Sequence, residues 1–443
     1  MLRAMLFERS LSDAAFSSLV TYAVLFLVAV FSLHAVSLRD PTSLFFNPDR
    51  AYEPSYSAVR QEEAEAFVFA AQNASLAKVD NGHGLQQKKL CAGIPSVARD
   101  GASYLRTAVE SLIDGLTAEE RDSIYFIVFI PHTDATMHPA YQEDWLSSLL
   151  DRILLYDPPE DKMQHIISLE RDAGLFREKG LLDHTYLLKA CYAKETPYVA
   201  MFEDDILAMD GWYHRTLAGL EEAESRSARS RTSRDFLYLR LFYTEEFLGW
   251  NSEHWRIYLS WSLLTMTVLV TSLSLVRCIF PAGRKVLSQQ VPYIICGVCL
   301  PLSILLFFAA GKVTVLPLPI GINEMNNYGC CSQGLVFSRS KAEELSAWFE
   351  TKKIGFVDML TEEYADQYDE LRWALTPSVV QHIGRKSSKG DDFGSAAKHH
   401  RSVAEKLWNF AFENNNAAVL KQEHLHAVEQ SPLAYITEHT SLS

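Results

Sequence analysis

Three long apolar runs without a charged side chain constrain what this chain can fold into. The first run, Ala14 to Leu38, extends over 25 residues without Asp, Glu, Lys or Arg. At about 1.5 Å of rise per residue, such a helix crosses the roughly 30 Å hydrocarbon core of a bilayer. We therefore predict an N-terminal transmembrane anchor. A cleaved signal peptide is the alternative, but its apolar region usually has only about 7–15 residues.

Two further charge-free runs lie deep in the chain, at Ile257 to Val276 and at Val291 to Gly311. The segment between them carries Arg277, Arg284 and Lys285 and no acid, which places it on the cytoplasmic side by the positive-inside rule. We therefore predict a transmembrane hairpin whose outer ends both face the lumen. A buried helical pair in a soluble core is the alternative, although such helices usually keep a polar stripe.

The apolar runs divide the chain into seven predicted segments. These are a cytoplasmic tail (1–13), the anchor (14–38), a lumenal stem (39–88), the first part of a globular domain (89–256), the hairpin with its cytoplasmic loop (257–311), the second part of that domain (312–395) and a helical tail (396–443). Asn73, in the sequence Asn-Ala-Ser, is an N-glycosylation sequon that agrees with a lumenal position.

The seven cysteines divide between the two predicted compartments. Those assigned to the hairpin and its loop are Cys278, Cys296 and Cys299, and those assigned to the lumen are Cys91, Cys191, Cys330 and Cys331. Four lumenal thiols permit two disulfides with three possible connectivities. We expect the adjacent Cys330 and Cys331 to bond elsewhere rather than to each other. The sequence contains no pair of C-x-x-C motifs, so a structural zinc site is not expected.

The charge balance excludes one large class of partner. Asp and Glu outnumber Lys and Arg by 55 to 41, which leaves a formal net charge of −14. A phosphate backbone demands a basic footprint, so nucleic acid is not an expected partner.

Short apolar runs alternate with helical patterns in the segment before the hairpin. The predicted strands are 89–97, 123–131, 164–170 and 198–204, and the predicted helices are 104–116, 142–154 and 181–195. This alternation predicts an α/β fold with a mainly parallel sheet and helices on both faces.

Three consecutive acids, Glu203, Asp204 and Asp205, end the last of these predicted strands. Ligands of such sheets bind at the carboxyl ends of the strands. Packed carboxylates repel one another unless a cation compensates them, so the triplet suggests a bound Mn²⁺ or Mg²⁺ ion, which can also neutralise a nucleotide diphosphate. A solvated helix cap at Asp205 or Asp210 is the alternative.

The stretch "FEDDI" resembles the acidic metal and nucleotide motif of GT-A glycosyltransferases, although those enzymes usually write it D-x-D and this chain has E-D-D. Other stretches resemble a narrower group. These are "DFLYLRLFYTEEFLGW" (235–250), the two-helix insertion directly after it, "GFVDMLTEEYAD" (355–366) and "PSVVQHIGRKSS" (377–388). Together they resemble the Golgi post-GPI-attachment N-acetylgalactosaminyltransferase family. The last stretch also resembles N-acetylglucosaminyltransferase IV, an N-glycan branching enzyme.

The resemblance implies a GT-A-type catalytic domain, held in the lumen of the Golgi by an anchor and an inserted hairpin. It implies an inverting transfer of an N-acetylhexosamine, GalNAc from UDP-GalNAc, onto a mannose of the glycosylphosphatidylinositol (GPI) glycan. Mn²⁺ or Mg²⁺ is the implied cofactor. The hairpin suits an acceptor that lies at the membrane surface.

The resemblance also implies roles for single residues. Asp205 is the expected metal contact, with Glu203 and Asp204 as supporting acids that lie near the donor ribose or behind the metal ligands. Asp358 in "GFVDML" is the expected general base, because an inverting transfer needs a carboxylate to take the proton of the attacking hydroxyl. Its alternative is a helix cap beside solvated Glu362 and Glu363.

Four further residues are expected to contact the donor or the metal. His382 in "QHIG" completes the metal shell or contacts the diphosphate, unless it is structural. Arg240 faces the diphosphate or pairs with Glu245 or Glu246. Lys179 and Asp183 resemble positions near the sugar nucleotide.

Three other functions compete with this interpretation. A multipass transporter does not need about 350 lumenal residues arranged around an acidic triplet. A non-catalytic glycan-binding relative is suggested by E-D-D in place of D-x-D, whereas Asp358 and His382 argue for catalysis. An N-glycan branching N-acetylglucosaminyltransferase is the main rival within the enzymes, because spacing does not reveal which sugar the donor pocket selects.

Overall fold

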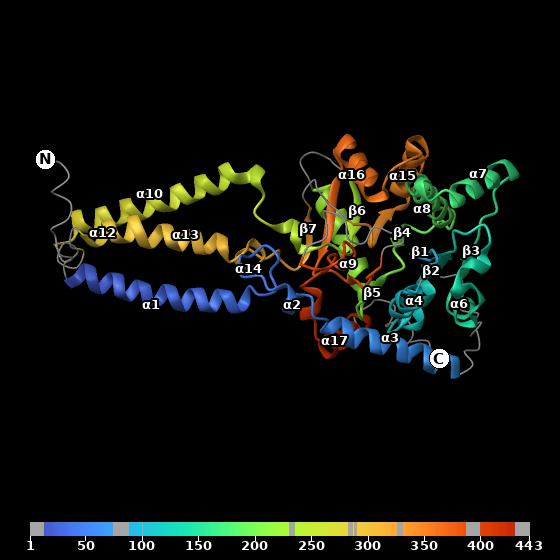
Figure 1. Cartoon of the computed structure of the whole chain (residues 1–443), viewed down its shortest axis with the longest axis horizontal. Coiled ribbons are helices and arrows are strands. Elements are labelled where there is room, and N and C mark those ends of the chain that lie inside the picture. Colours follow the sequence, from blue (N-terminus) through green and yellow to red (C-terminus); the bar gives the residue numbers. More distant parts are fainter. Residues whose placement is uncertain are drawn as a thin grey trace, which may run out of the picture. The chain divides into compact units, whose positions relative to one another are not determined.

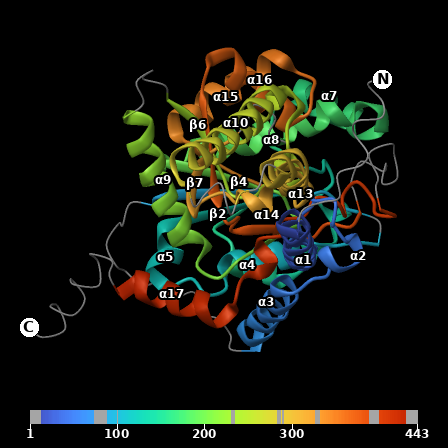
Figure 2. The same ribbon diagram turned by 90° about the vertical axis from the view of Figure 1, so that its left-hand side faces the viewer.

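The computed structural model of the chain describes residues 13–73, 88–99, 101–229, 235–281, 287, 290–325, 331–386 and 399–429, and of residues 13, 14 and 68–73 it describes the backbone alone. The chain divides into two units, each built from two separate stretches (Figure 1 and Figure 2). The apolar unit comprises Met1–Glu53 and Glu245–Pro317, and the sheet domain comprises Pro54–Thr244 and Leu318–Ser443. The second stretch of the apolar unit therefore interrupts the sheet domain.

In the described part of the apolar unit, three helical stretches are long and apolar enough to cross a membrane, Ala15–Val36, Glu245–Ile279 and Gln290–Ala309. In the most apolar part of each stretch, the buried share of residues is 0% for the first, 0% for the second and 11% for the third. Such exposure does not fit a buried helical pair in a soluble core. The elements of the unit are α1 (Asp13–Val36), α2 (Pro48–Ala51), η4 (Glu245–Leu248), η5 (Ser252–His254), α10 (Trp255–Ile279), α12 (Gln290–Ile294), the π-helical η6 (Ile295–Cys299), α13 (Leu300–Ala309) and α14 (Lys312–Val315).

The ends of α1 and α13 are tied together within the apolar unit. The amide of Leu44 donates to the carbonyl of Ala309 at 2.9 Å, and Asp40 accepts hydrogen bonds from the amide and hydroxyl of Thr314 at 2.7 and 2.8 Å. Tyr22, inside α1, donates to the carbonyl of Cys299 at 2.7 Å. Thus α1 and α13 run in the same direction and α10 runs against them (Figure 1). An anchor followed by an inserted hairpin requires this arrangement, and the membrane topology stays a prediction.

The sheet domain is built on one large sheet and one small sheet. The strands are β1 (Leu90–Pro95), β2 (Ile124–Phe129), β3 (Arg152–Leu154), β4 (Tyr198–Phe202), β5 (Ile206–Ala208), β6 (Phe236–Arg240), β7 (Gly321–Glu324), β8 (Gly334–Ser338), β9 (Leu371–Thr376) and β10 (Val380–His382). The large sheet has the order β3-β2-β1-β4-β8-β6-β9-β7. Its pairs β3–β2, β2–β1, β1–β4 and β6–β9 are parallel, whereas β8 lies antiparallel between β4 and β6, and β7 is antiparallel to β9. The predicted α/β fold with a mostly parallel sheet is confirmed.

Helices cover both faces of this sheet because successive strand residues point to opposite sides. In β1, Ala92 packs into one buried cluster with Leu112 of α4 and Trp212 of α9, whereas Cys91 packs into a second cluster with Leu187 of α8. The helices of the sheet domain are α3 (Tyr56–Asn73), α4 (Leu105–Ile113), α5 (Ala118–Ser123), η1 (Ala135–Met137), η2 (Pro139–Gln142), α6 (Asp144–Leu149), α7 (Glu160–Arg171), η3 (Ala173–Leu175), α8 (Phe176–Tyr192), α9 (Trp212–Ala228), α15 (Arg339–Lys352), α16 (Val357–Tyr368), η7 (Phe412–Asn414) and α17 (Ala417–Glu429).

Two predicted elements are wrong. Residues 164–170, predicted as a strand, lie in α7, where Ile166 and Leu169 are buried three positions apart on one helical face. The predicted helix 142–154 is shorter, because α6 ends at Leu149 and residues 152–154 form β3. The third parallel strand therefore comes earlier in the chain than predicted.

One disulfide fastens a central strand to the helix beside it. Cys91 of β1 bonds Cys191 of α8, with their Cα atoms 5.5 Å apart. Because Cys91 and Cys191 bond each other, neither of them is a partner of Cys330 or Cys331. Cys331 is also disulfide-bonded, and Cys330 lies outside the described residues. Asn73 is the last residue of α3, and its side chain is likewise outside the described part.

The segment 399–429, which lies in the predicted helical tail, packs onto the sheet domain. Buried Glu413 accepts hydrogen bonds from the amides of Ser55 and Ser57 at 2.7 and 3.1 Å. On α17, His424 lies between two carboxylates, with Nδ1 3.0 Å from Asp210 and Nε2 2.9 Å from Glu120. These hydrogen bonds hold α17 to α5 and to the loop before α9.

Candidate active site

The candidate site lies where the parallel strands β1 and β4 end side by side. Glu203, Asp204 and Asp205 directly follow β4, and Ser96 and Arg99 lie in the segment after β1. The carboxyl ends of neighbouring parallel strands meet at one edge of the sheet, so residues about 105 positions apart in sequence come into contact. Asp204 and Asp205 are both buried.

Asp204 is bound on several sides by the chain itself. Arg99 donates from Nη2 to Oδ1 at 2.6 Å and from Nη1 to Oδ2 at 2.7 Å, and the Ser96 hydroxyl donates to Oδ2 at 2.5 Å. His138 accepts from the amide of Ala140 at Nδ1, so we assign the ring hydrogen to Nε2, which lies 3.0 Å from Ser96 Oγ. Arg99 therefore supplies part of the positive charge that the sequence analysis attributed to a metal alone.

Asp205 faces His382 because of how the small sheet pairs. Strand β5 begins at Ile206, and β10 lies antiparallel to it with His382 opposite Ile206. The amide of Ile383 donates to the carbonyl of Asp205 at 2.9 Å, and His382 Nε2 lies 3.4 Å from Asp205 Oδ2. The other carboxylate oxygen, Oδ1, is buried and accepts no hydrogen bond from a described residue.

Gly384 keeps the space in front of this pair open. A Cβ atom at this position would lie 2.5 Å from Asp205 Oδ2 and 2.8 Å from His382 Nε2, closer than real Cβ contacts allow. Any side chain at Gly384 would therefore fill the space beside the two atoms that face each other.

The ring of His382 is oriented by the segment that follows the sheet. Its Nδ1 lies 3.1 Å from the carbonyl of Leu407, which can only accept, so Nδ1 carries the hydrogen and Nε2 is left toward Asp205. Gln381 exchanges two hydrogen bonds of 2.9 Å with the backbone of Asn409 and so fixes the same segment. Residues far beyond the sheet therefore set which nitrogen of His382 faces the site.

This donor set fits a divalent metal ion. Asp205 offers a buried carboxylate oxygen without a hydrogen-bond partner, His382 offers Nε2, and Gly384 leaves room between them. The oxygen donor suits both Mn²⁺ and Mg²⁺, whereas the imidazole favours a transition ion and therefore Mn²⁺.

The electrostatics concentrate negative charge on Asp205. Burial alone would raise the pKa of Asp205, but the neighbouring His382 and Arg99 lower it on balance. Burial would lower the pKa of His382, but the carboxylate of Asp205 raises it on balance. Burial raises the pKa of Asp204 despite Arg99. Asp205 is therefore the carboxylate best prepared to hold a cation.

Glu203 and Arg240 lie on the far side of Asp204, toward β8 and α16. Glu203 accepts from the Ser332 hydroxyl at 2.5 Å and from the Gln333 side-chain amide at 3.1 Å. Arg240, the buried last residue of β6, donates to the carbonyl of Cys331 at 2.6 Å. The adjoining residues 331–333 thus connect Glu203 to Arg240.

Asp358 stands in the first turn of α16, the helix that also binds Arg240. One turn later, Glu362 accepts from Arg240 Nη2 at 2.8 Å and lies 3.0 Å from Arg372 Nε. Asp358 is half-buried and acts electrostatically on Arg240. Glu362, which the helix-cap alternative for Asp358 placed in solvent, is buried and pairs with both arginines.

Lys179 and Asp183 form a separate ion pair on α8. Their charged atoms lie 2.8 Å apart, and Lys179 also donates to the carbonyl of Pro131 at 2.8 Å and to the hydroxyl of Tyr156 at 2.9 Å. Tyr156 hydrogen-bonds Asp183, whose pKa burial raises to about 6. Pro131 and Tyr156 follow β2 and β3, so this pair lies at the same edge of the sheet as the acids.

Arg99 thus lies within ion-pair distance of both Asp204 and Asp205, and His382 faces Asp205. Among the described residues, no hydrogen bond or ion pair links Asp358, Lys179 or Asp183 to these acids. Sequence reasoning missed Ser96, Arg99, His138 and Gly384. The first two carried a usable signal, because Ser96 lies at the end of the first predicted strand and Arg99 follows it, so both had to reach the same edge.

Comparison with known proteins identifies the family. The family described as GPI-N-acetylgalactosamine transferase PGAP4 matches residues 90–381, about two thirds of the 443 residues. This range contains the three acids, Asp358 and the whole interruption by the apolar unit.

Mannosyl-glycoprotein 4-beta-N-acetylglucosaminyltransferases are similar to a shorter part of the chain. Alpha-1,3-mannosyl-glycoprotein 4-beta-N-acetylglucosaminyltransferase A of Bos taurus is 29% identical over 150 residues, covering 31% of this chain and 27% of the relative. The Rattus norvegicus enzyme gives the same identity over 28% of its length, and the B enzyme of Danio rerio is 24% identical over 143 residues, 30% of this chain and 26% of its own length. These matches span only about a quarter of each relative, whereas the family match spans most of the sheet domain. The chain therefore belongs to the family described as GPI-N-acetylgalactosamine transferase PGAP4.

Proposed function

We propose that this chain transfers N-acetylgalactosamine from UDP-GalNAc to a mannose of a GPI glycan, with inversion at the anomeric carbon. The observation that carries this proposal is the open Asp205–His382 pair at the carboxyl edge of the sheet, in a chain of this family. We further propose that the protein resides in the Golgi membrane with a GT-A-type sheet domain in the lumen. The three apolar helices and the cationic residues Arg277, Arg284 and Lys285 support that orientation.

The chain's own residues divide the chemistry between them. Asp358 takes the proton of the acceptor hydroxyl while its oxygen bonds to the anomeric carbon of the donor. The bond from that carbon to the UDP oxygen breaks at the same time, and UDP leaves with the electron pair. Arg99 and Ser96 hold Asp204 rigid, so the adjoining Asp205 keeps its position during the reaction.

Asp205 and His382 would hold a Mn²⁺ or Mg²⁺ ion, which supplies positive charge that compensates the leaving diphosphate. Burial of Asp205 and His382 strengthens this interaction, because water screens charges poorly inside a protein. Glu203, Lys179, Asp183 and Arg240 are proposed to shape the donor site around these two residues.

The test is a transfer assay with the purified full-length chain in detergent. UDP-GalNAc, UDP-GlcNAc and UDP-galactose are each supplied with a mannose-containing GPI glycan, in Mn²⁺ or in EDTA. Mn²⁺-dependent transfer of GalNAc, with the linkage inverted relative to the donor, is the expected result. Failure of folded protein to use any UDP-sugar contradicts the proposal and favours a glycan-binding relative.

Transfer of N-acetylglucosamine to an N-glycan is the second candidate function. The identity to the 4-beta-N-acetylglucosaminyltransferases favours it, since the matched region covers about a third of this chain. Use of UDP-GlcNAc with an N-glycan acceptor, but not with the GPI glycan, would select this candidate.

A further inference from the structure

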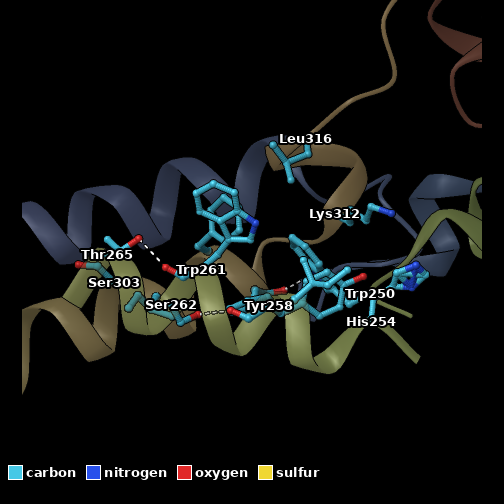
Figure 3. A pocket seen from close by; sticks show the side chains of 13 residues that line it. Trp250, His254, Tyr258, Trp261, Ser262, Thr265, Ser303, Lys312 and Leu316 are labelled. Atoms are coloured by element: carbon cyan, nitrogen blue, oxygen red, sulfur yellow. Dashed lines mark hydrogen bonds between the residues drawn. The ribbon is translucent and has the colours of Figure 1, made fainter. Parts of the chain in front are cut away.

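A groove of about 660 Å³ lies between α10 and α13, within the apolar unit (Figure 3). Its walls include Ile257 and Trp261 of α10 and Ile304 and Phe307 of α13. The volume falls in the range of about 300–1,000 Å³ that is usual for small-molecule sites. From Ile257 to Thr265 the lining follows α10 for about 12 Å, at about 1.5 Å per residue. The groove is therefore elongated along the helix.

The groove presents mainly hydrocarbon although two serines and a threonine line it beside Tyr258. Ser262, Thr265 and Ser303 donate to the carbonyl four residues earlier, at 2.8, 2.8 and 2.9 Å. These hydroxyls already donate hydrogen bonds within their own helices, so they do not need an acceptor on a molecule bound in the groove. The stretch between these helices therefore suits an alkyl chain.

One end of the groove is cationic and polar. Figure 3 shows Lys312 and His254 near Trp250 at that end, with Thr265 and Ser303 at the other. Trp250 is fixed there by its indole nitrogen, which donates to the carbonyl of Phe308 at 3.0 Å. Among the described residues, no carboxylate forms an ion pair with Lys312. A chain with an anionic group at one end complements this arrangement.

We propose that the groove binds the lipid end of the acceptor: one hydrocarbon chain between α10 and α13, and the inositol phosphate at Lys312 and His254. This inference rests on the proposed function, which gives the acceptor a phosphate-bearing glycolipid anchor. Two of the three chain connections between the apolar unit and the sheet domain, at Thr244–Glu245 and at Pro317–Leu318, lie close in sequence to Trp250 and Leu316 of the groove. Binding here would hold the lipid of the acceptor close, along the chain, to the point where the apolar unit continues into the sheet domain.

The first experiment measures lipid binding without any transfer reaction. The full-length chain in nanodiscs is exposed to a phosphatidylinositol probe with a photoreactive alkyl chain, and labelled peptides are mapped by mass spectrometry. Labelling of 255–265 and 300–308 is expected, and Ile304→Trp should reduce it at least fivefold by filling the groove. Leu305→Trp is the matched control, because Leu305 is exposed on the same helix and does not line the groove.

A second measurement links binding to transfer. The ratio of kcat/KM for the lipid-linked glycan to that for the same glycan freed of lipid should fall about tenfold in Ile304→Trp and in Lys312→Glu, and not in Leu305→Trp. Labelling that Ile304→Trp does not reduce overturns the site. Equal labelling by a phosphatidylcholine probe overturns the assignment to the acceptor, because it shows binding of bulk lipid. The labelling result stands even if no transfer is found, so the two proposals fail separately.

Discussion

At the scale of single residues, the candidate site depends on the missing side chain at Gly384. Gly384→Ala places a carbon 2.5 Å from Asp205 Oδ2, and the neighbours that would have to yield are themselves buried. We expect binding of Mn²⁺ and UDP, measured by calorimetry at a temperature where the variant stays folded, to weaken at least tenfold, and the unfolding temperature to fall because buried neighbours must shift. Gly180→Ala is the control, because an added carbon there meets no atom within 4 Å. Unchanged binding in Gly384→Ala would remove the metal from this position.

The role of Asp358 is separable from donor binding. Asp358→Asn should lower kcat by roughly 10²–10⁴, because the amide cannot accept the hydroxyl proton, while UDP binding stays nearly the same. Glu363→Gln, on the same helix and paired with Lys352 at the surface, should leave kcat unchanged. Loss of UDP binding in Asp358→Asn would show that Asp358 belongs to the donor site instead.

At the scale of residues, the acids of the site could be predicted from the sequence, whereas the side chains that contact them could not. Three consecutive carboxylates after an apolar strand are visible in a linear chain. Arg99 is about 105 positions away from Asp204, and only the parallel pairing of β1 with β4 brings it close. The resemblance supplied His382, whereas the role of Leu407 in orienting its ring depends on backbone geometry that no spacing encodes.

At the scale of elements, α17 is held to the domain by an imidazolium. Asp210 and Glu120 raise the pKa of His424 to about 9, and His214 stacks on its ring with the ring centres 5.2 Å apart. A histidine pKa raised by folding stabilises the folded state fully below about pH 6.5, and the contribution is lost as the pH rises through about 9.

The unfolding temperature should therefore fall between pH 7 and pH 9.5. The fall should be smaller in His424→Gln, which cannot carry the charge. His426→Gln, on the exposed side of the same helix, is the control and should behave like the unaltered chain. Equal slopes for all three proteins in a thermal melt series would contradict this role of His424.

Elements were predicted best where periodicity was unambiguous. Strands β1, β2 and β4 and helices α4 and α8 lie close to their predicted positions. The prediction for "QHIISLE" was wrong because a short apolar run fits both the two-residue period of a strand and the 3.6-residue period of a helix. In the structure Ile166 and Leu169 are buried on one face of a helix. The antiparallel insertion of β8 between β4 and β6 was beyond sequence reasoning, since it arises from tertiary packing.

At the scale of the whole molecule, the predicted membrane topology can be tested with glycosylation tags. A new Asn-x-Ser sequon placed between Arg277 and Gln290 should stay unmodified, because the cationic loop is expected in the cytoplasm. The natural sequon at Asn73 is the internal control and should be modified. A mass shift removed by a glycosidase for the new sequon would place the loop in the lumen and overturn the hairpin topology.

The position of β8 also determines when the sheet can be completed during synthesis. Strands β1 to β6 leave the ribosome before the apolar stretch 245–317, and β8 leaves after it. Because β8 pairs with both β4 and β6, these two strands have no shared neighbour until the later helices have been made. The large sheet therefore stays incomplete until β8 has been synthesised. In the meantime the unpaired edges of β4 and β6 are open to aggregation, which chaperones counteract. Substitutions that delay insertion of the later helices should consequently be detected by cellular quality control as folding defects of the domain itself.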